Sequence, residues 1–178
     1  NGNIQNTINI TAVEQIKDYH TRKTVLVGTN KYVLLNEKIQ EVYMEYEYNE
    51  EKQSEQRNEI KIEQLKALRF AEDFEKLREN AISYRTKNGD YPFITLYNFG
   101  ELSEYKPRND FAAEYLSIGG FEIKSTPAFS SSADAMKNLL ENPSNIITIC
   151  SSDEKYIHIV PEFAQMVKKF KPLTYIIL

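Results

Sequence analysis

The residues that could do chemistry in this chain lie mostly in the stretches that follow its apolar segments. The longest such stretch runs from Asn98 to Arg108 and reads N-F-G-E-L-S-E-Y-K-P-R. A loop that binds phosphate needs glycines or hydroxyl groups, so that its backbone can approach the anion closely. This stretch has one glycine and two glutamates. It therefore disfavours both a flavin mononucleotide site and a dinucleotide site.

Metal-binding and nucleophilic side chains are few and far apart. The two histidines, His20 and His158, have no carboxylate or cysteine at the spacing of a metal site. Asp153 stands alone, whereas a phosphoryl-accepting signalling domain would need an acidic cluster to hold a divalent cation. Cys150 follows an apolar run, where a reactive thiolate could form, but a buried and inert cysteine is the simpler interpretation. We predict no catalytic, cofactor-binding or metal-binding residue in this chain.

The serine run Ser130-Ser131-Ser132, followed by Asp134, has two interpretations. Hydroxyl groups at a helix N-terminus could bind an anion. Serine is also a preferred N-cap, and an aspartate in the first turn favours the helix dipole. Capping explains the whole run, so we expect a helix to begin here and assign the serines no catalysis.

Composition narrows the class of protein. The chain has 178 residues, a net charge of −4 and a pI near 5.4, and its lysines are scattered among glutamates, which disfavours nucleic-acid binding. It has 12 tyrosines and no tryptophan, and tyrosine suits a partner surface because its ring packs while its hydroxyl stays hydrated. A single cysteine and the lack of an export signal or of an apolar run near 18 residues predict a cytoplasmic protein without membrane contact.

Residues 1–90 are expected to form a connecting segment. Ile10, Val13 and Ile16 share a helical face within residues 1–20, and Thr11 is a candidate N-cap. The apolar runs 24–28 and 32–35 are expected to be extended and buried. Residues 41–63 hold eight glutamates, which suits either an acidic docking surface or, as we prefer, a solvated linker. Apolar residues at helical spacing between 65 and 84 then predict a helix of more than twenty residues that ends near Lys87.

Residues 91–178 are expected to form a wound parallel α/β domain of flavodoxin-like type. The expected elements are a strand over 93–97, a helix through 111–116, a strand over 121–123, a helix over 133–140, a strand over 146–150, a helix over 153–170 and a strand over 175–178. The alternation of strands and helices favours right-handed parallel crossovers. Ligands of such sheets bind beyond the carboxyl ends of the strands. Chemistry should therefore be sought after Tyr97, in residues 126–132 and in residues 150–153.

The last expected strand has no polar or turn-forming residue after it. The chain closes on Thr174-Tyr175-Ile176-Ile177-Leu178. We expect that a fifth strand would follow in a longer protein, and that its loss leaves an open sheet edge. Such an edge predicts self-association of the fragment.

Several stretches carry a resemblance to a known family. The run from Arg108 to Glu122 (R-N-D-F-A-A-E-Y-L-S-I-G-G-F-E), then 149–153 (I-C-S-S-D) and 160–162 (V-P-E), looks like the C-terminal domain of methylmalonyl-CoA mutase. The run 22–32 (R-K-T-V-L-V-G-T-N-K-Y) is similar to the family's V-G-V-N-K-Y stretch, which leads from the substrate barrel toward that domain. The resemblance spans most of the chain.

In members that bind cobalamin, the first loop carries D-x-H-x-x-G, whose histidine coordinates cobalt while the aspartate orients it. Counting back from Gly120-Phe121, these positions fall on Ser103, Tyr105 and Arg108. Phenol is a feeble cobalt ligand. Arginine in place of glycine would block the approach of the nucleotide tail. The resemblance thus implies a degenerate cobalamin-binding-like domain that binds no cobalamin.

By this resemblance, the chain is the C-terminal fragment of the small, non-catalytic subunit of a heterodimeric mutase. The intact complex would isomerise methylmalonyl-CoA to succinyl-CoA with adenosylcobalamin bound by the large, catalytic subunit. The role of this chain would be structural, with residues 30–32 and the tyrosine-rich 32–48 as candidate contact surfaces. Two alternatives remain open: a domain that binds cobalamin without histidine ligation, and a free-standing monomeric module for another small ligand.

Overall fold

The computed structural model describes residues 3–34 and 68–178. By its internal contacts the chain divides into two compact units, Asn1–Thr24 with Asn36–Phe70, and Val25–Leu35 with Ala71–Leu178. The predicted acidic linker 41–63 lies outside the described residues. The expected division of the chain at residue 90 stays a prediction.

The described part of the first unit is built on one helix, α1 (Asn3–His20). The predicted cap at Thr11 is wrong, because the helix begins eight residues earlier. Inside the helix, the Thr11 hydroxyl donates to the Thr7 carbonyl at 3.1 Å, a bond that satisfies the side chain without a cap. The ring of Tyr19 packs at 4.8 Å from that of Phe70, so Phe70 lies against the C-terminal end of α1.

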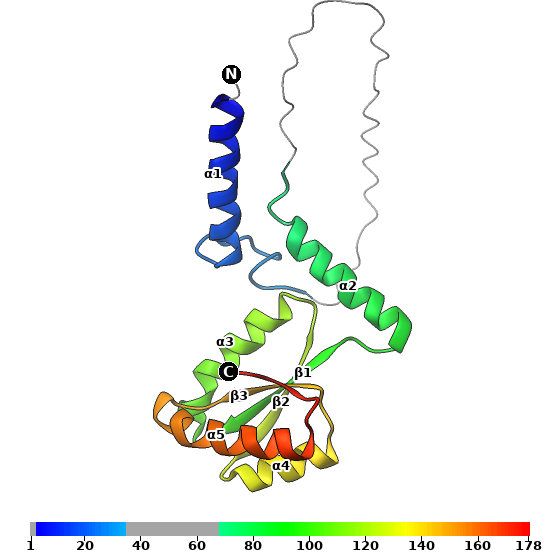
Figure 1. Cartoon of the computed structure of the whole chain (residues 1–178), viewed down its shortest axis with the longest axis vertical. Helices are drawn as coiled ribbons and strands as arrows, with labels where there is room; N and C mark the ends of the chain where they lie inside the picture. The colour runs from blue at the N-terminus through cyan, green and yellow to red at the C-terminus, as the bar shows by residue number, and fades with distance from the viewer. Residues whose placement is uncertain (1–2, 35–67) are drawn as a thin grey trace, which may run out of the picture. The chain divides into compact units, whose positions relative to one another are not determined.

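The second unit is a four-stranded parallel sheet with helices on both faces, which confirms the predicted α/β class (Figure 1). Its strands are β1 (Phe93–Phe99), β2 (Glu122–Phe129), β3 (Ile146–Cys150) and β4 (Tyr175–Ile177), in the spatial order β2-β1-β3-β4. The connecting helices are α3 (Leu102–Ser117), α4 (Ser132–Glu141) and α5 (Asp153–Phe170). In this order β2 lies on one side of β1, and β3 and β4 lie on the other side. The same order occurs in flavodoxin-like sheets.

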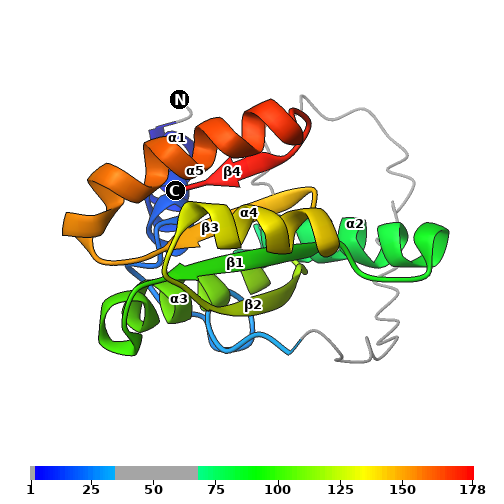
Figure 2. The ribbon, with the colours of Figure 1, turned by 90° about the horizontal axis from the view of Figure 1, so that it is seen from below.

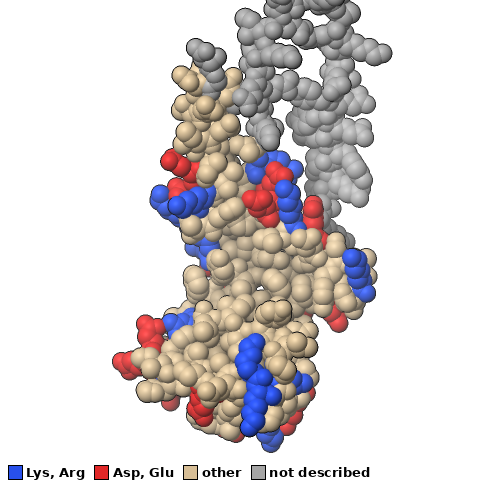
Figure 3. Space-filling view, in the orientation of Figure 1, with Lys and Arg blue, Asp and Glu red and all other residues tan. Residues whose placement is uncertain are grey.

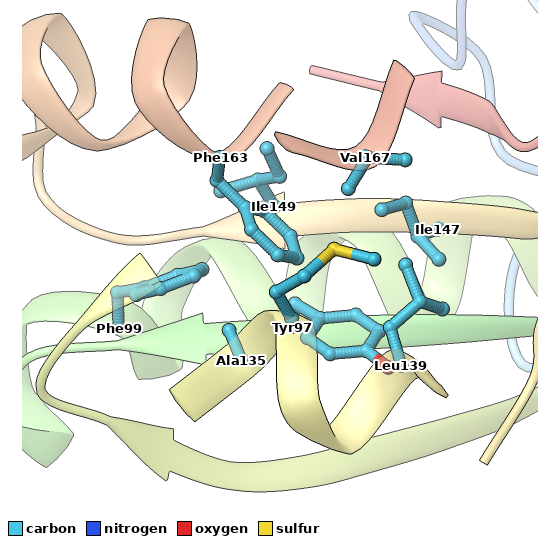
Figure 4. Packing of buried hydrophobic residues seen from close by; sticks show 9 residues of the cluster. Tyr97, Phe99, Ala135, Leu139, Ile147, Ile149, Phe163 and Val167 are labelled. Atoms are coloured by element: carbon cyan, nitrogen blue, oxygen red, sulfur yellow. The ribbon is translucent and has the colours of Figure 1, made fainter. Parts of the chain in front are cut away.

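Alternating residues of the central strand β1 face opposite layers of helix. Tyr97 and Phe99 point toward α4 and α5, where they pack with Leu139, Ile149 and Phe163 (Figure 4). On the other face, α3 covers a smaller buried cluster whose members are Ile94, Leu96, Ala112 and Cys150. Figure 2 shows α3 on one side of the sheet and α4 on the other. Strands buried on both faces read as continuous apolar runs, which is why the sequence located β1 and β3 well.

Strand β2 is longer than the predicted 121–123 and takes in residues that were expected to form a loop. One extra residue lies on β2 between its pairings Leu96↔Ser125 and Asn98↔Ala128, which is a β-bulge. At the bulge, the Thr126 hydroxyl donates to the Leu96 carbonyl at 3.1 Å and accepts from the Asn98 amide at 3.3 Å. The side chain replaces the missing ladder bonds, so the strand continues past Pro127 at the edge of the sheet.

Helix starts in this unit are capped by nearby side chains. Ser131 accepts from the Asp134 amide at 3.2 Å, which confirms that the serine run begins a helix. Ser152 accepts in the same way from the Lys155 amide at the start of α5. At the start of α3, Glu101 and Glu104 form a capping box. That box lets α3 begin at Leu102, so the long loop expected up to Arg108 is wrong.

The helix α2 (Glu72–Asn88) has 17 residues, whereas a helix of more than twenty residues was predicted. Its Ala81 is buried against Gly120, at which a Cβ atom would lie 2.6 Å from the Cβ of Ala81. This close contact fastens α2 to the turn after α3. Gly120 has φ +84°, a left-handed conformation that glycine adopts without strain.

Of the two apolar runs expected to be extended and buried, the described residues 24–28 and 32–34 are neither strands nor core. The structure places a tight turn there, with one isolated bridge between Val27 and Lys31. Val27 is 76% exposed and Leu34 is 72% exposed, whereas Asn30 is fully buried. The prediction was wrong because it took apolarity as a sign of burial, while here a buried asparagine organises the turn.

Candidate functional site

The site to be tested lies at the carboxyl edge of the sheet, where β1, β2 and β3 end. The three positions of the cobalt-binding motif, Ser103, Tyr105 and Arg108, all lie on the first turns of α3 and not on a loop. Ser103 is exposed on the outer surface. Tyr105 is half-buried against the apolar cluster beneath α3. Only Arg108 reaches across the edge of the sheet.

Arg108 closes the space between α3 and α5. Its Nη1 donates to the Ser151 carbonyl at 2.8 Å, and its Nη2 donates to Asp153 Oδ1 at 2.5 Å. The guanidinium carbon lies 4.1 Å from the centre of the Tyr156 ring, a cation–π distance. The Tyr156 hydroxyl in turn donates to the Ile149 carbonyl. One cation thus bonds to the end of β3 and to the first turn of α5.

A second bridge between the same helices lies beside Arg108. Lys155 Nζ contacts Glu104 Oε2 at 2.6 Å, and this bond lowers the pKa of the Glu104 carboxyl. The pair lies over Gly100, where a Cβ atom would stand 2.3 Å from Glu104 Oε2 and 2.8 Å from Lys155 Nζ. Gly100 has φ +90°, so glycine serves both the turn and the close approach. We call Glu104, Arg108, Asp153, Lys155 and Tyr156 the α3–α5 clasp.

Beneath α3, a polar network connects the ends of β1 and β2. The Asn109 side chain donates to Asn98 Oδ1 and to the Ser125 hydroxyl, both at 2.8 Å. The Asn98 side chain donates to Ser125 at 3.0 Å and to the Thr126 carbonyl at 2.6 Å. Asn98 and Asn109 are 1% and 7% exposed, so these amides are satisfied within the protein. The sequence analysis missed this pair, because Asn98 and Asn109 lie at the ends of the expected loop and their meeting depends on α3 beginning earlier than predicted.

Cys150 is fully buried at the end of β3. Burial raises the pKa of its thiol to about 11, although the nearby Arg108 charge opposes the shift. Burial likewise raises the pKa of Tyr156, and Arg108 again opposes the shift. A thiol that stays protonated near neutral pH is a poor nucleophile. The environment of Cys150 fits the inert cysteine that we expected.

The two histidines lie in different units. His20 ends α1 in the first unit, and His158 is exposed on α5 in the second. Within residues 3–34 and 68–178, no group of three or more His, Cys, Asp and Glu side chains could hold a metal ion. Figure 3 shows both signs of charge on the face in view. No described helix is long and apolar enough to span a bilayer.

The side chains at the carboxyl edge differ from those with which the resembling family holds a corrinoid cofactor. At the position that the resemblance assigns to the cobalt ligand, the half-buried Tyr105 ring packs against the apolar cluster beneath α3. At the position of the glycine, Arg108 is bonded to Ser151 and Asp153 and is stacked on Tyr156. A nucleotide tail that entered this edge would have to break these contacts. The arrangement can hold α3 to α5.

Comparison with known proteins adds one distant similarity. No family model matches the chain. The chain is 25% identical, over 162 residues, to the methylmalonyl-CoA mutase small subunit of Porphyromonas gingivalis. The match covers 89% of this chain and 24% of the relative, so the chain spans about a quarter of that protein's length. The similarity supports a distant relationship between this chain and part of a mutase small subunit.

Proposed function

We propose that this chain is the C-terminal part of the non-catalytic small subunit of a heterodimeric methylmalonyl-CoA mutase. Its role is to pair with the large catalytic subunit and stabilise it in the cytoplasm. The similarity to a protein named as a mutase small subunit supports this assignment. The flavodoxin-like sheet supports it as well, because the resembling family has a domain of this class at its C-terminus.

In this proposal the chain binds no cobalamin, and adenosylcobalamin belongs to the partner subunit. The observation that carries this part is Arg108, whose guanidinium is bonded to the Ser151 carbonyl and packed on Tyr156 at the edge where the cofactor would enter. By resemblance, the assembled enzyme isomerises methylmalonyl-CoA to succinyl-CoA. The radical chemistry is supplied by the cofactor.

Pairing is tested by co-expression of this chain with a mutase large subunit from the same organism. We expect the two chains to elute together in size-exclusion chromatography, as a complex that is larger than either chain alone. A second measurement is the melting temperature of the large subunit, which should rise on pairing because a partner that binds only the folded state stabilises it. Separate elution at every concentration would refute the partner role.

Cofactor binding is tested by adding adenosylcobalamin to the chain alone. We expect the visible spectrum of the cofactor and the melting temperature of the chain to stay unchanged. A change in the spectrum together with a rise in melting temperature would instead support the alternative, in which the domain binds cobalamin without histidine ligation.

A further inference from the structure

The helix α2 ends in a dipeptide that is chemically labile. Asn88 is the last residue of the helix, and Gly89 follows it. The sequence holds the pair Asn-Gly at 1–2 and at 88–89, and the second pair lies in the described residues. Asparagine is among the thermolabile residues, and a following glycine has no Cβ atom to keep its nitrogen away from the asparagine side chain. The end of α2 is therefore a candidate site of spontaneous modification.

The last turns of α2 contribute no side chain to the core. Ala81 is the last buried residue of the helix, and every residue from Ile82 to Asp90 is exposed. Figure 2 shows this end of α2 projecting beyond the sheet. A Cβ atom at Gly89 would meet nothing within 4 Å. Helix ends without buried side chains open at little cost in free energy, so we expect the last turn of α2 to open and close in the folded chain.

Two hydrogen bonds hold the labile groups while the last turn is closed. Asn88 Nδ2 donates to the Tyr84 carbonyl at 2.8 Å, and the Gly89 amide donates to the Arg85 carbonyl at 2.8 Å. The nitrogen that would attack and the side-chain amide that would be attacked are thus bonded to different carbonyl groups. Both bonds belong to the last turn, so they are lost when this turn opens. The closed helix therefore slows the reaction, and the opening of one turn permits it.

We propose that Asn88 is a site of deamidation, at a rate controlled by the opening of the last turn of α2. In the open turn the Gly89 nitrogen can approach Asn88 Cγ to about 3–3.5 Å, the distance of a reactive encounter. The nitrogen then bonds to Cγ and gives its proton to water. The bond between Cγ and Nδ2 breaks, and ammonia leaves with a proton taken from water. A cyclic imide remains.

Water opens the imide at either of its two carbonyl carbons. Attack at Cγ gives aspartate in the ordinary main chain, and attack at the other carbon gives isoaspartate, whose main chain runs through Cγ. The net change consumes one water and releases one ammonia, without an oxidant or a reductant. Neither product can donate a hydrogen bond to the Tyr84 carbonyl as Asn88 does, and each adds a negative charge at the C-terminal end of the helix. The reaction needs the residues of this chain alone, so it does not depend on the mutase role.

Peptide mapping by mass spectrometry, after incubation of the whole chain at neutral pH, tests the proposal. We expect the peptide that holds Asn88 to gain about one dalton and to separate into an aspartate form and an isoaspartate form. Isoaspartate arises only through the cyclic imide, so its presence identifies the route. Asn142 is the internal control. It is exposed at the end of α4 and its Nδ2 donates to the Asn138 carbonyl at 3.4 Å, but Pro143 follows it and has no N–H to attack.

The variant Asn88→Gln separates this chemistry from other changes in mass. Glutamine keeps the side-chain amide at an exposed position, so the fold should be unchanged. Its longer side chain must close a larger ring, and we expect conversion at this position to fall about tenfold or more. Equal conversion in the variant and in the unaltered chain would overturn the proposal.

The control by the helix end is tested by the same mapping in urea that unfolds the chain. Conversion of Asn88 should be several-fold faster there than in the folded chain, because the two hydrogen bonds of the last turn are then always open. Equal rates in the two conditions would show that α2 does not control the reaction. If Asn88 in the folded chain converts no more than Asn142, the site itself is refuted.

Discussion

Arg108 shows how one substituted residue can change what a sheet edge does. It lies where the resembling family has a glycine, and its contacts reach the Ser151 carbonyl, Asp153 and the Tyr156 ring. These contacts contribute unequally to the stability of the fold. Asp153 is 93% exposed, so its ion pair is hydrated and contributes little, whereas the Ser151 carbonyl belongs to a residue that is 2% exposed.

We therefore expect Arg108→Met to lower the free energy of unfolding by about 1–2 kcal/mol, through the lost hydrogen bond and the lost cation–π contact. Urea unfolding measures the change. Asp153→Asn is the control, and it should shift stability by less than about 0.5 kcal/mol because the pair is exposed. Equal losses in the two variants would mean that the ion pair holds the clasp together and the carbonyl bond does not.

Cys150 predicts a dependence of stability on pH. Its pKa is raised by burial from an ordinary value of 9.0 to about 11, so the folded chain keeps its proton where the unfolded chain releases it. The protonated Cys150 thiol thus contributes to the free energy of unfolding. This contribution is fully present below the pKa of the thiol in the unfolded chain, and it is lost as pH rises toward 11. Between about pH 9 and about pH 10 it should fall by about 1 kcal/mol.

Urea unfolding of the unaltered chain and of Cys150→Ala across this range measures the effect. Burial also raises the pKa of Tyr97, to about 12, so both proteins should lose stability at high pH. The difference in unfolding free energy between the two proteins reports the effect of the thiol alone. This difference should become smaller as pH rises. A difference that stays constant would show that the thiol ionises alike in the folded and unfolded states.

At the scale of elements, the close contact between α2 and the turn after α3 is the feature most open to test. Gly89 and Gly120 both have positive φ, at +93° and +84°. A Cβ at Gly89 would meet nothing within 4 Å, whereas one at Gly120 would lie 2.6 Å from the Ala81 Cβ. The two glycines thus share a backbone requirement and differ in packing.

We expect Gly89→Ala to cost about 1–2 kcal/mol of stability, from the left-handed backbone alone. Gly120→Ala should cost about 1–3 kcal/mol more, because α2 must also shift. Thermal unfolding compares the two variants. Adding Ala81→Gly to Gly120→Ala should recover part of the extra loss through a favourable coupling, and no coupling would mean that the helices do not meet as closely as described.

At the scale of the whole molecule, the two edges of the sheet differ. Edge strand β2 carries Lys124, whose ammonium lies 4.0 Å from the centre of the Phe93 ring, and Pro127, which offers no amide hydrogen. Lysine and proline are devices that keep an edge from pairing with another chain. Edge strand β4 has neither, and Tyr175 is 71% exposed while Leu178 beyond it is 69% exposed. The unprotected edge is β4.

We expect the chain alone to self-associate through β4 as its concentration rises. Tyr175→Lys should shift the equilibrium toward monomer, because a charge at the edge must be desolvated on pairing. Sedimentation velocity over a concentration series measures this, with Ile157→Lys as a control of matched exposure. If both variants associate like the unaltered chain, or if the unaltered chain is monomeric throughout, β4 pairing is wrong.

Periodicity in the sequence located most elements of the α/β unit. Strand β3 and helix α5 have the bounds that the apolar runs predicted, since each is buried on faces that local spacing reveals. The second half of β2 was missed, because Pro127 and its polar neighbours indicate a loop and only the Thr126 hydroxyl bond shows otherwise. Thr11 was predicted to be a cap from its residue type and spacing. In the structure it lies inside α1, where its hydroxyl bonds to the Thr7 carbonyl.

The sequence by itself determined the order and type of the elements, the parallel sheet and the substitution of Ser103, Tyr105 and Arg108 at the motif positions. These features depend on residue type and short-range spacing. The tertiary structure alone decided that Arg108 reaches Ser151, 43 residues away, and that Asn30 is buried while Val27 is exposed. Burial and hydrogen-bond partners depend on segments that meet only in the fold, so residue spacing along the chain carries no record of them.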